Sequence, residues 1–402
     1  MMMVSRITSI ILFVWMCSTT YATAKVYHER VIWHENPANE AIISWTTDEQ
    51  GQQSYVLYDS IARKGEVKTY RFQQSAQLEG RFDRGWLFGK TPYYHHTKLT
   101  DLTPDTDYYF VVVTDNEQSQ EYWFRTAPAD DSEFSLIFGG DSRSDHTQRI
   151  RMNQLLREKF ERADEVYALV HGGDYIADGG KWSDWDQWLH HHNYTITASR
   201  RMLPIVPTRG NHEYNPQLFN QVFAFPGGGK SYYTTRIQKL AIITLNTEIS
   251  THGEQRIWLT NELERRQKDS KWIVANYHRP AYPAVKRPSS AKSAWVPLFE
   301  QYQIDLVFES DGHVYKQTLP IFNERHDAER GIVYVGEGGL GVRQRTPDHK
   351  LWYLQGEGFA VSSHHFQILR ITEDNLFFEG IAEDNSLLTS LSLEPREERA
   401  HL

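Results

Sequence analysis

Short hydrophobic runs separated by turn residues indicate that the chain from about residue 25 to residue 127 is an all-β domain. The runs are rich in Tyr, Val, Ile, Thr and Trp, and Asp, Gly, Pro and Asn separate them. Strands with this spacing favour a sandwich of two sheets. The clearest runs are AIISWTTD (41–48), SYVLYDS (54–60), YHHTKLTDL (94–102), TDYYFVVVTD (106–115) and EYWFRT (121–126).

Beyond a polar linker at 127–133, the pattern predicts strands that alternate with helices. Continuously apolar runs predict strands at 134–141 and 166–174, and apolar residues at helical spacing predict a helix between them at 147–163. The alternation continues until Gly331, where the pattern returns to strands, and it predicts a sheet buried on both faces. The other predicted helices are 182–192, 255–267 and 294–302.

The first 24 residues are expected to be a secretory signal peptide. They combine a basic residue, Arg6, with an apolar run at 10–16 and small residues at Ala22 and Ala24. The run is shorter than the ~20 residues that span a bilayer, so we expect cleavage near Ala24 and a secreted or periplasmic protein without a transmembrane segment. Cys17, the only cysteine, lies in this segment, so we expect no disulfide and no thiol catalysis in the mature chain.

Length and charge narrow the function classes. The length of the mature chain predicts two domains, which we place at 25–127 and 133–395. Without the signal peptide, 42 Lys and Arg residues stand against 52 Asp and Glu residues, so the formal net charge is −10. We expect no duplex nucleic-acid binding, which normally requires a basic face. A small phosphate ester stays a suitable partner, because a bound metal ion reverses the local field.

Polar residues that can bind metal ions follow five predicted strands of the second domain. They are Asp141 after LIFGG, Asp174 after ALVHGG, Asn211 and His212 after IVPTRG, His278 after IVANY, and Asp311 and His313 after LVFES. In an open α/β sheet, binding sites form at the carboxyl ends of the strands. A single Asp or His at a strand end usually makes a structural hydrogen bond, but the ordered set predicts a metal site.

The motifs GGDSR, HGGDYIADG, GNHE, VANYHRPAY and SDGHVYKQT resemble those of the calcineurin-like metallophosphoesterases. The segment LTDLTPDTDYYFVVV resembles the end of a fibronectin type III sandwich, so the chain looks most like the purple acid phosphatase branch. The resemblance implies an α/β four-layer (αββα) sandwich preceded by an all-β fibronectin type III-like sandwich. It also implies two divalent metal ions, either Mn, Fe, Zn or Mg, about 3.5–4 Å apart.

The resemblance further implies a role for each motif residue. His212 would hydrogen-bond the leaving group or a phosphate oxygen as a general acid. Arg143 would clamp the phosphate, because a guanidinium matches phosphate with two parallel hydrogen bonds; the alternative for Arg143 is an ion pair with Asp145. The implied ligands are Asp141, Asp174 and His313 for the first ion and Asp174, Asn211, His278 and Asp311 for the second.

The implied function is that of a secreted phosphoesterase, and a phosphomonoesterase is the preferred prediction. Two bound cations would neutralise phosphate oxygens and lower the pKa of a bound water towards ~7, which makes hydroxide available. One alternative is a phosphodiesterase that acts on nucleotides or lipid head groups. The other is a non-catalytic surface binding module on a phosphatase fold.

Three positions depart from the family pattern. Ala177 stands where the purple enzymes carry a metal-binding tyrosine, and Tyr175 is expected to point elsewhere, so we expect a colourless protein. Arg143 stands where relatives have histidine or glycine. Asp311 replaces a histidine. Because a carboxylate oxygen is a harder ligand, we expect the site to prefer Mn²⁺, Fe²⁺ or Mg²⁺. An alternative alignment of this loop would put Tyr315 at the metal and leave Asp311 without a role.

Other conspicuous groups are expected to be structural. Trp182, Trp185 and Trp188 stand at helical spacing, so we expect them to pack in the core. The three histidines at 190–192 are expected at a solvated helix end, because consecutive helical residues point in different directions. His171 suits a place in the core and a supporting place beside the site equally well.

Overall fold

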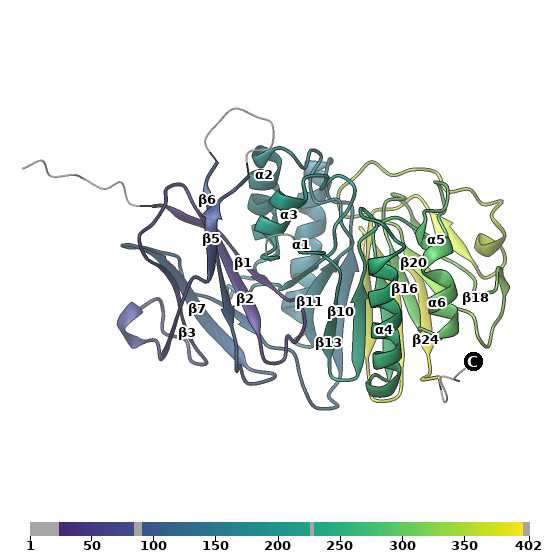
Figure 1. Ribbon diagram of the computed structural model, residues 1–402, viewed down its shortest axis with the longest axis horizontal. Coiled ribbons are helices and arrows are strands. Elements are labelled where there is room, and N and C mark those ends of the chain that lie inside the picture. The colour runs from purple at the N-terminus through teal and green to yellow at the C-terminus, as the bar shows by residue number, and fades with distance from the viewer. Residues whose placement is uncertain (1–23, 84–90, 226–228, 397–402) are drawn as a thin grey trace, which may run out of the picture.

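The computed structural model describes residues 24–83, 91–225 and 229–396, and Figure 1 shows how their elements are arranged. All but the last residue of the predicted signal peptide lie outside these ranges, so the signal peptide stays a prediction. Within the described ranges, no helix is both long and apolar enough to cross a membrane.

The N-terminal part of the molecule, called the front domain below, is the predicted all-β domain. It forms the purple and blue end of the ribbon, at the left of Figure 1. One sheet holds β1, β2, β6 and β5, and the other holds β3, β4, β7, β8 and β9. The indole N–H of Trp45 in β2 donates to the hydroxyl of Thr114 in β7 at 3.0 Å, which joins the two sheets. The elements are β1 (Val26–Ile32), β2 (Ala41–Thr47), β3 (Ser54–Asp59), η1 (Val67–Thr69), β4 (Phe72–Ser75), β5 (Leu78–Arg81), β6 (Tyr93–Leu99), β7 (Asp107–Thr114), β8 (Glu117–Gln118) and β9 (Tyr122–Arg125).

The second part alternates strands and helices, as predicted. Its first sheet contains β12 (Ile205–Pro207), β11 (Val166–His171), β10 (Phe134–Gly139), β22 (His365–Ile371), β23 (Leu376–Ala382) and β24 (Leu387–Leu393). Its second sheet has the order β13 (Tyr233–Ile237), β14 (Leu240–Thr244), β15 (Trp272–Asn276), β16 (Leu306–Glu309), β20 (Val333–Gly336), β17 (Tyr315–Gln317) and β21 (Phe359–Val361). The remaining elements are α1 (His146–Arg162), α2 (Trp182–His192), η2 (Asn193–Thr195), α3 (Pro216–Val222), α4 (Glu254–Asp269), α5 (Ala291–Ala294), α6 (Val296–Gln301), β18 (Ile321–Phe322), β19 (Arg325–His326) and η3 (Trp352–Leu354).

The two sheets of the second part pack face to face, with helices on their outer faces. Along β10, Leu136 and Phe138 point between the sheets and Ile137 points towards α1, because alternate strand residues face opposite sides. Phe138 stacks on Phe308 of β16, with ring centroids 3.6 Å apart. On the far side, Leu259 of α4 packs against the second sheet. This order of helix, sheet, sheet and helix confirms the predicted αββα sandwich.

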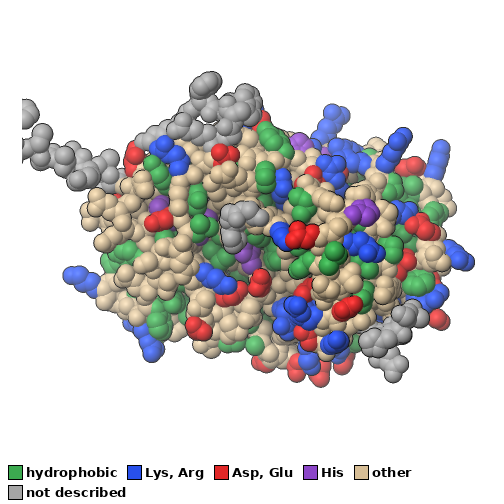
Figure 2. All heavy atoms as spheres, in the orientation of Figure 1, with side chains coloured by type: hydrophobic (Ala, Val, Ile, Leu, Met, Phe, Trp, Pro, Cys, Tyr) green, Lys and Arg blue, Asp and Glu red, His purple; other side chains and the backbone are tan. Residues whose placement is uncertain are grey.

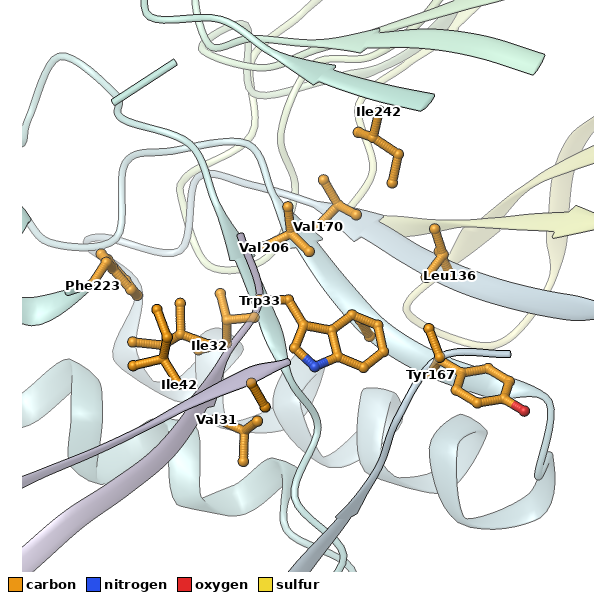
Figure 3. Packing of buried hydrophobic residues seen from close by; sticks show 14 of the residues in the cluster. Val31, Ile32, Trp33, Ile42, Leu136, Tyr167, Val170, Val206, Phe223 and Ile242 are labelled. Carbon is orange, nitrogen blue, oxygen red and sulfur yellow. The ribbon is translucent and has the colours of Figure 1, made fainter. Parts of the chain in front are cut away.

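The front sandwich is continuous with the first sheet of the second part. Strand β1 pairs in parallel with β12, with Ile32 opposite Ile205, so one ten-stranded sheet runs through both parts. Trp33, directly after β1, is buried between the two parts, with Val31 on one side and Val206 on the other (Figure 3). The front domain is thereby fixed against the sheet that carries half of the candidate site.

The prediction of one helix at 294–302 is wrong. The structure forms two short helices there, α5 and α6, with Trp295 between them. Pro297 stands in the first turn of α6, where its missing N–H costs no helical hydrogen bond. Proline therefore favours a new helix start at this point rather than the interior of one longer helix.

Helix α2 spans the predicted residues, but its last turn is not solvated. His191 and His192 are buried, so the expected solvated helix end is wrong for both. The reason is packing against α1, because the side chain of Asn153 donates to the carbonyl oxygen of His191 at 2.9 Å. Trp185 and Trp188 are buried in the core, as predicted.

The surface shows both signs of charge. On the face drawn in Figure 2, Lys and Arg side chains are mixed with Asp and Glu side chains. The absence of duplex nucleic-acid binding stays a prediction from the net charge.

Candidate metal centre

The loops after five strands converge where the two facing sheets end. Strands β10, β11 and β12 run parallel in the first sheet, and β15 and β16 run parallel in the second. Their carboxyl ends bring together Asp141, Asp174, His278 and Asp311, which are all buried. One nitrogen or oxygen of each residue lies within 4.8 Å of the others. Residues from distant parts of the chain therefore form one buried group with the composition of a metal site.

Asn211 and His313 extend this group. The Asn211 Oδ1 lies 3.1 Å from His278 Nε2, and the His313 Nε2 lies 3.2 Å from Asp141 Oδ1. The structure thus places all six predicted ligands side by side, and their binding of metal ions stays a prediction. The six-residue cluster consists of Asp141, Asp174, Asn211, His278, Asp311 and His313.

The loop after β16 follows the first of the two alignments. Asp311 lies beside His278, with 3.7 Å between Oδ1 and Nε2, and His313 lies beside Asp141. Tyr315 lies on β17, where its hydroxyl contacts Thr389. The geometry therefore does not support the alternative that brings Tyr315 to the metal.

Four residues of the six-residue cluster have a left-handed backbone conformation, which is uncommon outside glycine. The angle φ is 56° at Asp141, 58° at Asp174, 69° at Asp311 and 62° at His313. Such conformations cost about 1–3 kcal/mol each and persist only where the surroundings impose them. Close packing is one such constraint at Asp141. Gly338 lies so near that a Cβ on it would be 1.8 Å from Asp141 Oδ2.

Glu213, the last residue of GNHE, ties two of these loops together. Its buried carboxylate accepts hydrogen bonds of 2.9 Å from the backbone N–H groups of Gly210, Asp174 and Tyr175. Burial, and after it the Asp174 carboxylate, raises the pKa of Glu213 above its usual range. Glu213 was not among the predicted site residues, although its place beside His212 in GNHE was a signal.

Backbone carbonyl groups fix the proton positions of two histidines. A carbonyl oxygen only accepts, so Nδ1–H of His278 donates to Gly172 at 2.9 Å and Nδ1–H of His212 donates to Ala177 at 2.6 Å. In the neutral form of His278, the lone pair on Nε2 then faces the carboxylates, as a metal ligand requires. The His212 Nε2 lies 3.9 Å from Asp174 Oδ2 on a side chain that is 30% exposed, so it can exchange protons.

The charges around His278 favour a cation at this place. Burial disfavours the imidazolium, but the carboxylates of Asp174, Asp141 and Asp311 outweigh it and raise the pKa of His278 well above its usual range. Among the described residues, the buried atoms Asp141 Oδ1 and His313 Nε2 have no hydrogen-bond partner, although they lie 3.2 Å apart. Buried polar atoms are normally paired, so two unpaired ligand atoms facing each other fit a metal ion.

Two basic side chains contact carboxylates of the cluster. The Nε of Arg143 lies 3.2 Å from Asp174 Oδ2. Asp145 instead caps α1 by accepting from the backbone N–H of Gln148 at 3.0 Å, so Arg143 pairs with Asp174 and the Asp145 alternative is wrong. The ammonium of Lys286 contacts Asp311. Lys286 was missed in the sequence analysis because it lies in a loop without a motif.

Three buried charged side chains also stabilise the loops that carry the cluster. Lys316, Glu309 and Glu337 have fully buried side chains, and the Lys316 ammonium contacts both carboxylates, that of Glu337 at 3.3 Å. Glu309 accepts from the backbone N–H of Ala281, and Glu337 accepts from that of Ala284 at 3.0 Å. These contacts hold the loops after β15, β16 and β20 together. The sequence signal for this group is that charged residues stand within or directly after apolar strands.

Tyr175 is turned away from the carboxylates, as predicted. Its hydroxyl accepts from the backbone N–H of Thr208 at 3.2 Å, and its ring stacks on His171 at 3.8 Å. The His171 Nε2 lies 3.1 Å from the hydroxyl of Ser142, directly after Asp141. His171 therefore belongs to the core and also supports the loop that carries Asp141.

A buried cluster of carboxylates and histidines at the strand ends of an αββα sandwich defines the class of metallophosphoesterases. Two family models match the chain. Residues 27–126 match the purple acid phosphatase N-terminal domain, and residues 144–315 match the calcineurin-like phosphoesterase domain. The chain belongs to the calcineurin-like phosphoesterases, in the branch that carries the purple acid phosphatase N-terminal domain.

Individual proteins with similar sequences or structures agree with this family assignment. An uncharacterized protein of Mycobacterium tuberculosis is 26% identical over 367 residues, which cover 78% of this chain and 63% of that protein. The phosphoenolpyruvate phosphatase of Allium cepa is 25% identical over 370 residues, which cover 82% and 73% of the two chains. A purple acid phosphatase from yellow lupin (Lupinus luteus) seeds has the same fold, with a TM-score of 0.75 at 17% identity over 92% of this chain and 74% of that one. The present chain thus spans less than two thirds of the mycobacterial relative.

Proposed function

We propose that this protein is a secreted, metal-dependent phosphoesterase, and specifically a phosphomonoesterase that uses two divalent metal ions. The six-residue cluster carries the proposal, because it joins buried ligand atoms from five loops. Within the described part of the chain, Asp141 Oδ1 and His313 Nε2 lack a hydrogen-bond partner there. A non-catalytic binding module would have no use for such strained and unpaired ligands.

The proposed ligands can be divided between two cations that share Asp174. Bound there, two divalent ions would neutralise phosphate oxygens and make hydroxide available near neutral pH. The three carboxylates are hard ligands, which favour Mn²⁺, Fe²⁺ or Mg²⁺, and Zn²⁺ stays compatible with the histidines. The proposed ligands are Asp141 and His313 for the first ion, Asn211, His278 and Asp311 for the second, and Asp174 for both.

His212 and Arg143 would act on the substrate. The hydrogen bond from Nδ1 of His212 to Ala177 leaves Nε2 as the atom that donates a proton to the leaving oxygen. Arg143 is held through its Nε, so its two terminal nitrogens can reach oxygens of one phosphate. Both side chains are partly exposed, at 30% and 17%, whereas the carboxylate of Asp174 is buried.

The test is hydrolysis of p-nitrophenyl phosphate by chelator-treated protein to which Mn²⁺, Fe²⁺, Zn²⁺ or Mg²⁺ is returned. We expect at least one ion to restore activity, and no restoration by any of them would contradict the proposal. Bis-p-nitrophenyl phosphate tests the diesterase alternative, and phosphoenolpyruvate belongs in the panel because of the Allium cepa relative. Asp174→Asn should abolish turnover, while Asp164→Asn, at an exposed position, should retain it.

Secretion is tested separately. Expression of the full chain in a bacterium should give a periplasmic protein whose N-terminal residue, determined by mass spectrometry, is close to Lys25. A cytosolic product that keeps Met1 would contradict this part of the proposal.

A further inference from the structure

We propose that Lys286 is a phosphate-binding residue that shares the carboxylate of Asp311 with the metal centre. The inference rests on the proposed function, because it requires a cation and a phosphate at the same place. The side chain of Lys286 is 37% exposed, and its ammonium contacts Oδ1 of Asp311, whose side chain is only 6% exposed. Lys286 therefore lies between a buried ligand and solvent.

One oxygen of Asp311 serves two partners. The Oδ1 atom that Lys286 contacts also lies 3.7 Å from Nε2 of His278. A cation bound between His278 and Asp311 would use this oxygen and would repel the ammonium of Lys286. Lys286 and the metal ion thus compete for Asp311, and metal binding releases the ammonium for another anion.

Backbone hydrogen bonds hold the loop on both sides of Lys286, so we expect its side chain to move rather than the loop. The N–H of Ala284 donates to both oxygens of the buried Glu337, at 3.1 and 3.0 Å, and the carbonyl oxygen of Ala284 accepts from Asp348 at 2.8 Å. On the other side, the N–H of Ser289 donates to Pro280 at 2.9 Å. A flexible lysine stem on this rigid loop can turn from Asp311 to a nearby phosphate without a change of the fold.

The released ammonium adds a third hydrogen-bond donor to two that already face the cluster. Arg143 and His212 face Asp174 from partly exposed positions, and Lys286 faces Asp311 in the same way. A monoester dianion carries one more negative charge than a diester, so an additional cation at this place favours monoesters.

Asp311 and Lys286 also balance each other in charge. Asp311 adds a third carboxylate to a cluster that already contains Asp141 and Asp174. Before a cation binds, Lys286 compensates this charge through its contact with Asp311. Asp311 and Lys286 thus form one functional unit.

The experiment measures two affinities on the full-length protein by titration calorimetry. Chelator-treated protein is titrated with Mn²⁺, and Mn²⁺-loaded protein is titrated with inorganic phosphate. The variants are Lys286→Met, which keeps the stem without the charge, and Lys286→Arg, which keeps the charge. Lys292→Met is the matched control, because Lys292 lies on α5 and pairs with Glu324 at 2.9 Å, outside the cluster.

Only the affinity for phosphate should fall in Lys286→Met. Lys286→Met should bind Mn²⁺ as tightly as the wild type or a few-fold tighter, and it should bind phosphate about 10-fold more weakly. Lys286→Arg should restore phosphate affinity to within about 3-fold, and Lys292→Met should match the wild type. In hydrolysis assays, Lys286→Met should lose more activity on the monoester than on the diester.

Two results would overturn the inference. One is unchanged phosphate affinity in Lys286→Met. The other is a joint loss of Mn²⁺ affinity, phosphate affinity and melting temperature, because this would assign Lys286 a structural role. Wild-type protein that binds neither Mn²⁺ nor phosphate would overturn the proposed function as well, whereas normal wild-type binding with an unaffected variant contradicts the inference alone.

Discussion

The backbone N–H of Asp311 donates a hydrogen bond of 2.9 Å to Oδ2 of Asp141, although the two residues lie 170 positions apart. This bond joins the loop after β10 of the first sheet to the loop after β16 of the second. It uses one oxygen of Asp141 for structure and leaves Oδ1 facing His313. One carboxylate therefore aligns the two sheets and also offers a ligand atom.

The substitution Asp141→Asn separates these two roles. The amide oxygen of Asn can still accept from Asp311, so we expect a melting temperature close to that of the wild type. The lost charge should reduce metal affinity by roughly 100-fold or more, since even residues that only support ligands contribute 10–100-fold. Thermal unfolding and metal analysis by mass spectrometry check both outcomes; an unfolded variant, or one with full metal content, would show that the roles are not separable in this way.

The substitution Glu213→Gln should reduce stability. Glu213 accepts three backbone hydrogen bonds of 2.9 Å, and the amide group of Gln would turn an N–H towards at least one of these donors. A buried donor without a partner costs about 1–3 kcal/mol, so urea denaturation should show a loss of that size. Glu373→Gln, at an exposed position, is the control and should change the midpoint little. Equal stability of wild type and Glu213→Gln would refute the proposed tie between the two loops.

Substitutions of Asp311 test its role as a ligand. Asp311→Ala should weaken the binding of one metal ion by roughly 100-fold or more, because it removes a buried ligand oxygen and even residues that only support ligands contribute 10–100-fold. Asp311→His should retain activity and shift the preference towards Zn²⁺, since imidazole is a softer ligand. Metal content and the rate with each added ion check these outcomes. Two tightly bound ions in Asp311→Ala would contradict the assignment.

The iron-loaded protein should be colourless. A purple colour requires a tyrosine phenolate at the metal, and Ala177 stands at that position. Tyr175 cannot replace it, because its hydroxyl accepts from Thr208 and burial raises its pKa well above the usual range. Absorption spectra of iron-loaded wild type and Tyr175→Phe should therefore agree and lack a visible charge-transfer band. Such a band in the wild type alone would place Tyr175 at the metal.

The ligand residues could be predicted because their signal is local. Each follows an apolar strand, and the carboxyl ends of parallel strands in α/β sheets form the site, so Asp141 and Asp174 could be placed without knowledge of the fold. The same rule located His278. The alignment of Asp311 rested on spacing alone, and the structure supports it through the 3.7 Å approach to His278.

The supporting residues could not be predicted, because their contacts link segments that no local pattern relates. Lys286 reaches Asp311 from a loop without a motif, and Glu337 accepts from Ala284, which lies 53 positions away. The parallel pairing of β1 with β12 is equally non-local, so the continuous sheet was not foreseen. Burial of His191 depended on how α2 packs against α1, where Asn153 donates to its carbonyl oxygen, and helical spacing alone does not determine that.

Buried histidines should make the protein sensitive to acid. Burial lowers the pKa of His192 and of His365 to about 4, from an ordinary value of 6.5. Between these values the unfolded chain binds protons that the folded chain does not, so the free energy of unfolding falls as the pH falls from 6.5 to 4. Each histidine contributes about 1.4 kcal/mol per pH unit, or about 2 kcal/mol between pH 6.5 and pH 5.

The variant His192→Phe tests this acid sensitivity. The ring of His192 stacks on Trp188 at 5.1 Å, so Phe can keep the packing while removing the titrating group. Urea denaturation at pH 7 and pH 5 should show a fall in stability that is about 2 kcal/mol smaller in His192→Phe than in the wild type. His326→Gln, on the exposed hairpin of β18 and β19, is the control and should show the wild-type fall. An unchanged fall in His192→Phe would mean that other groups cause the acid sensitivity.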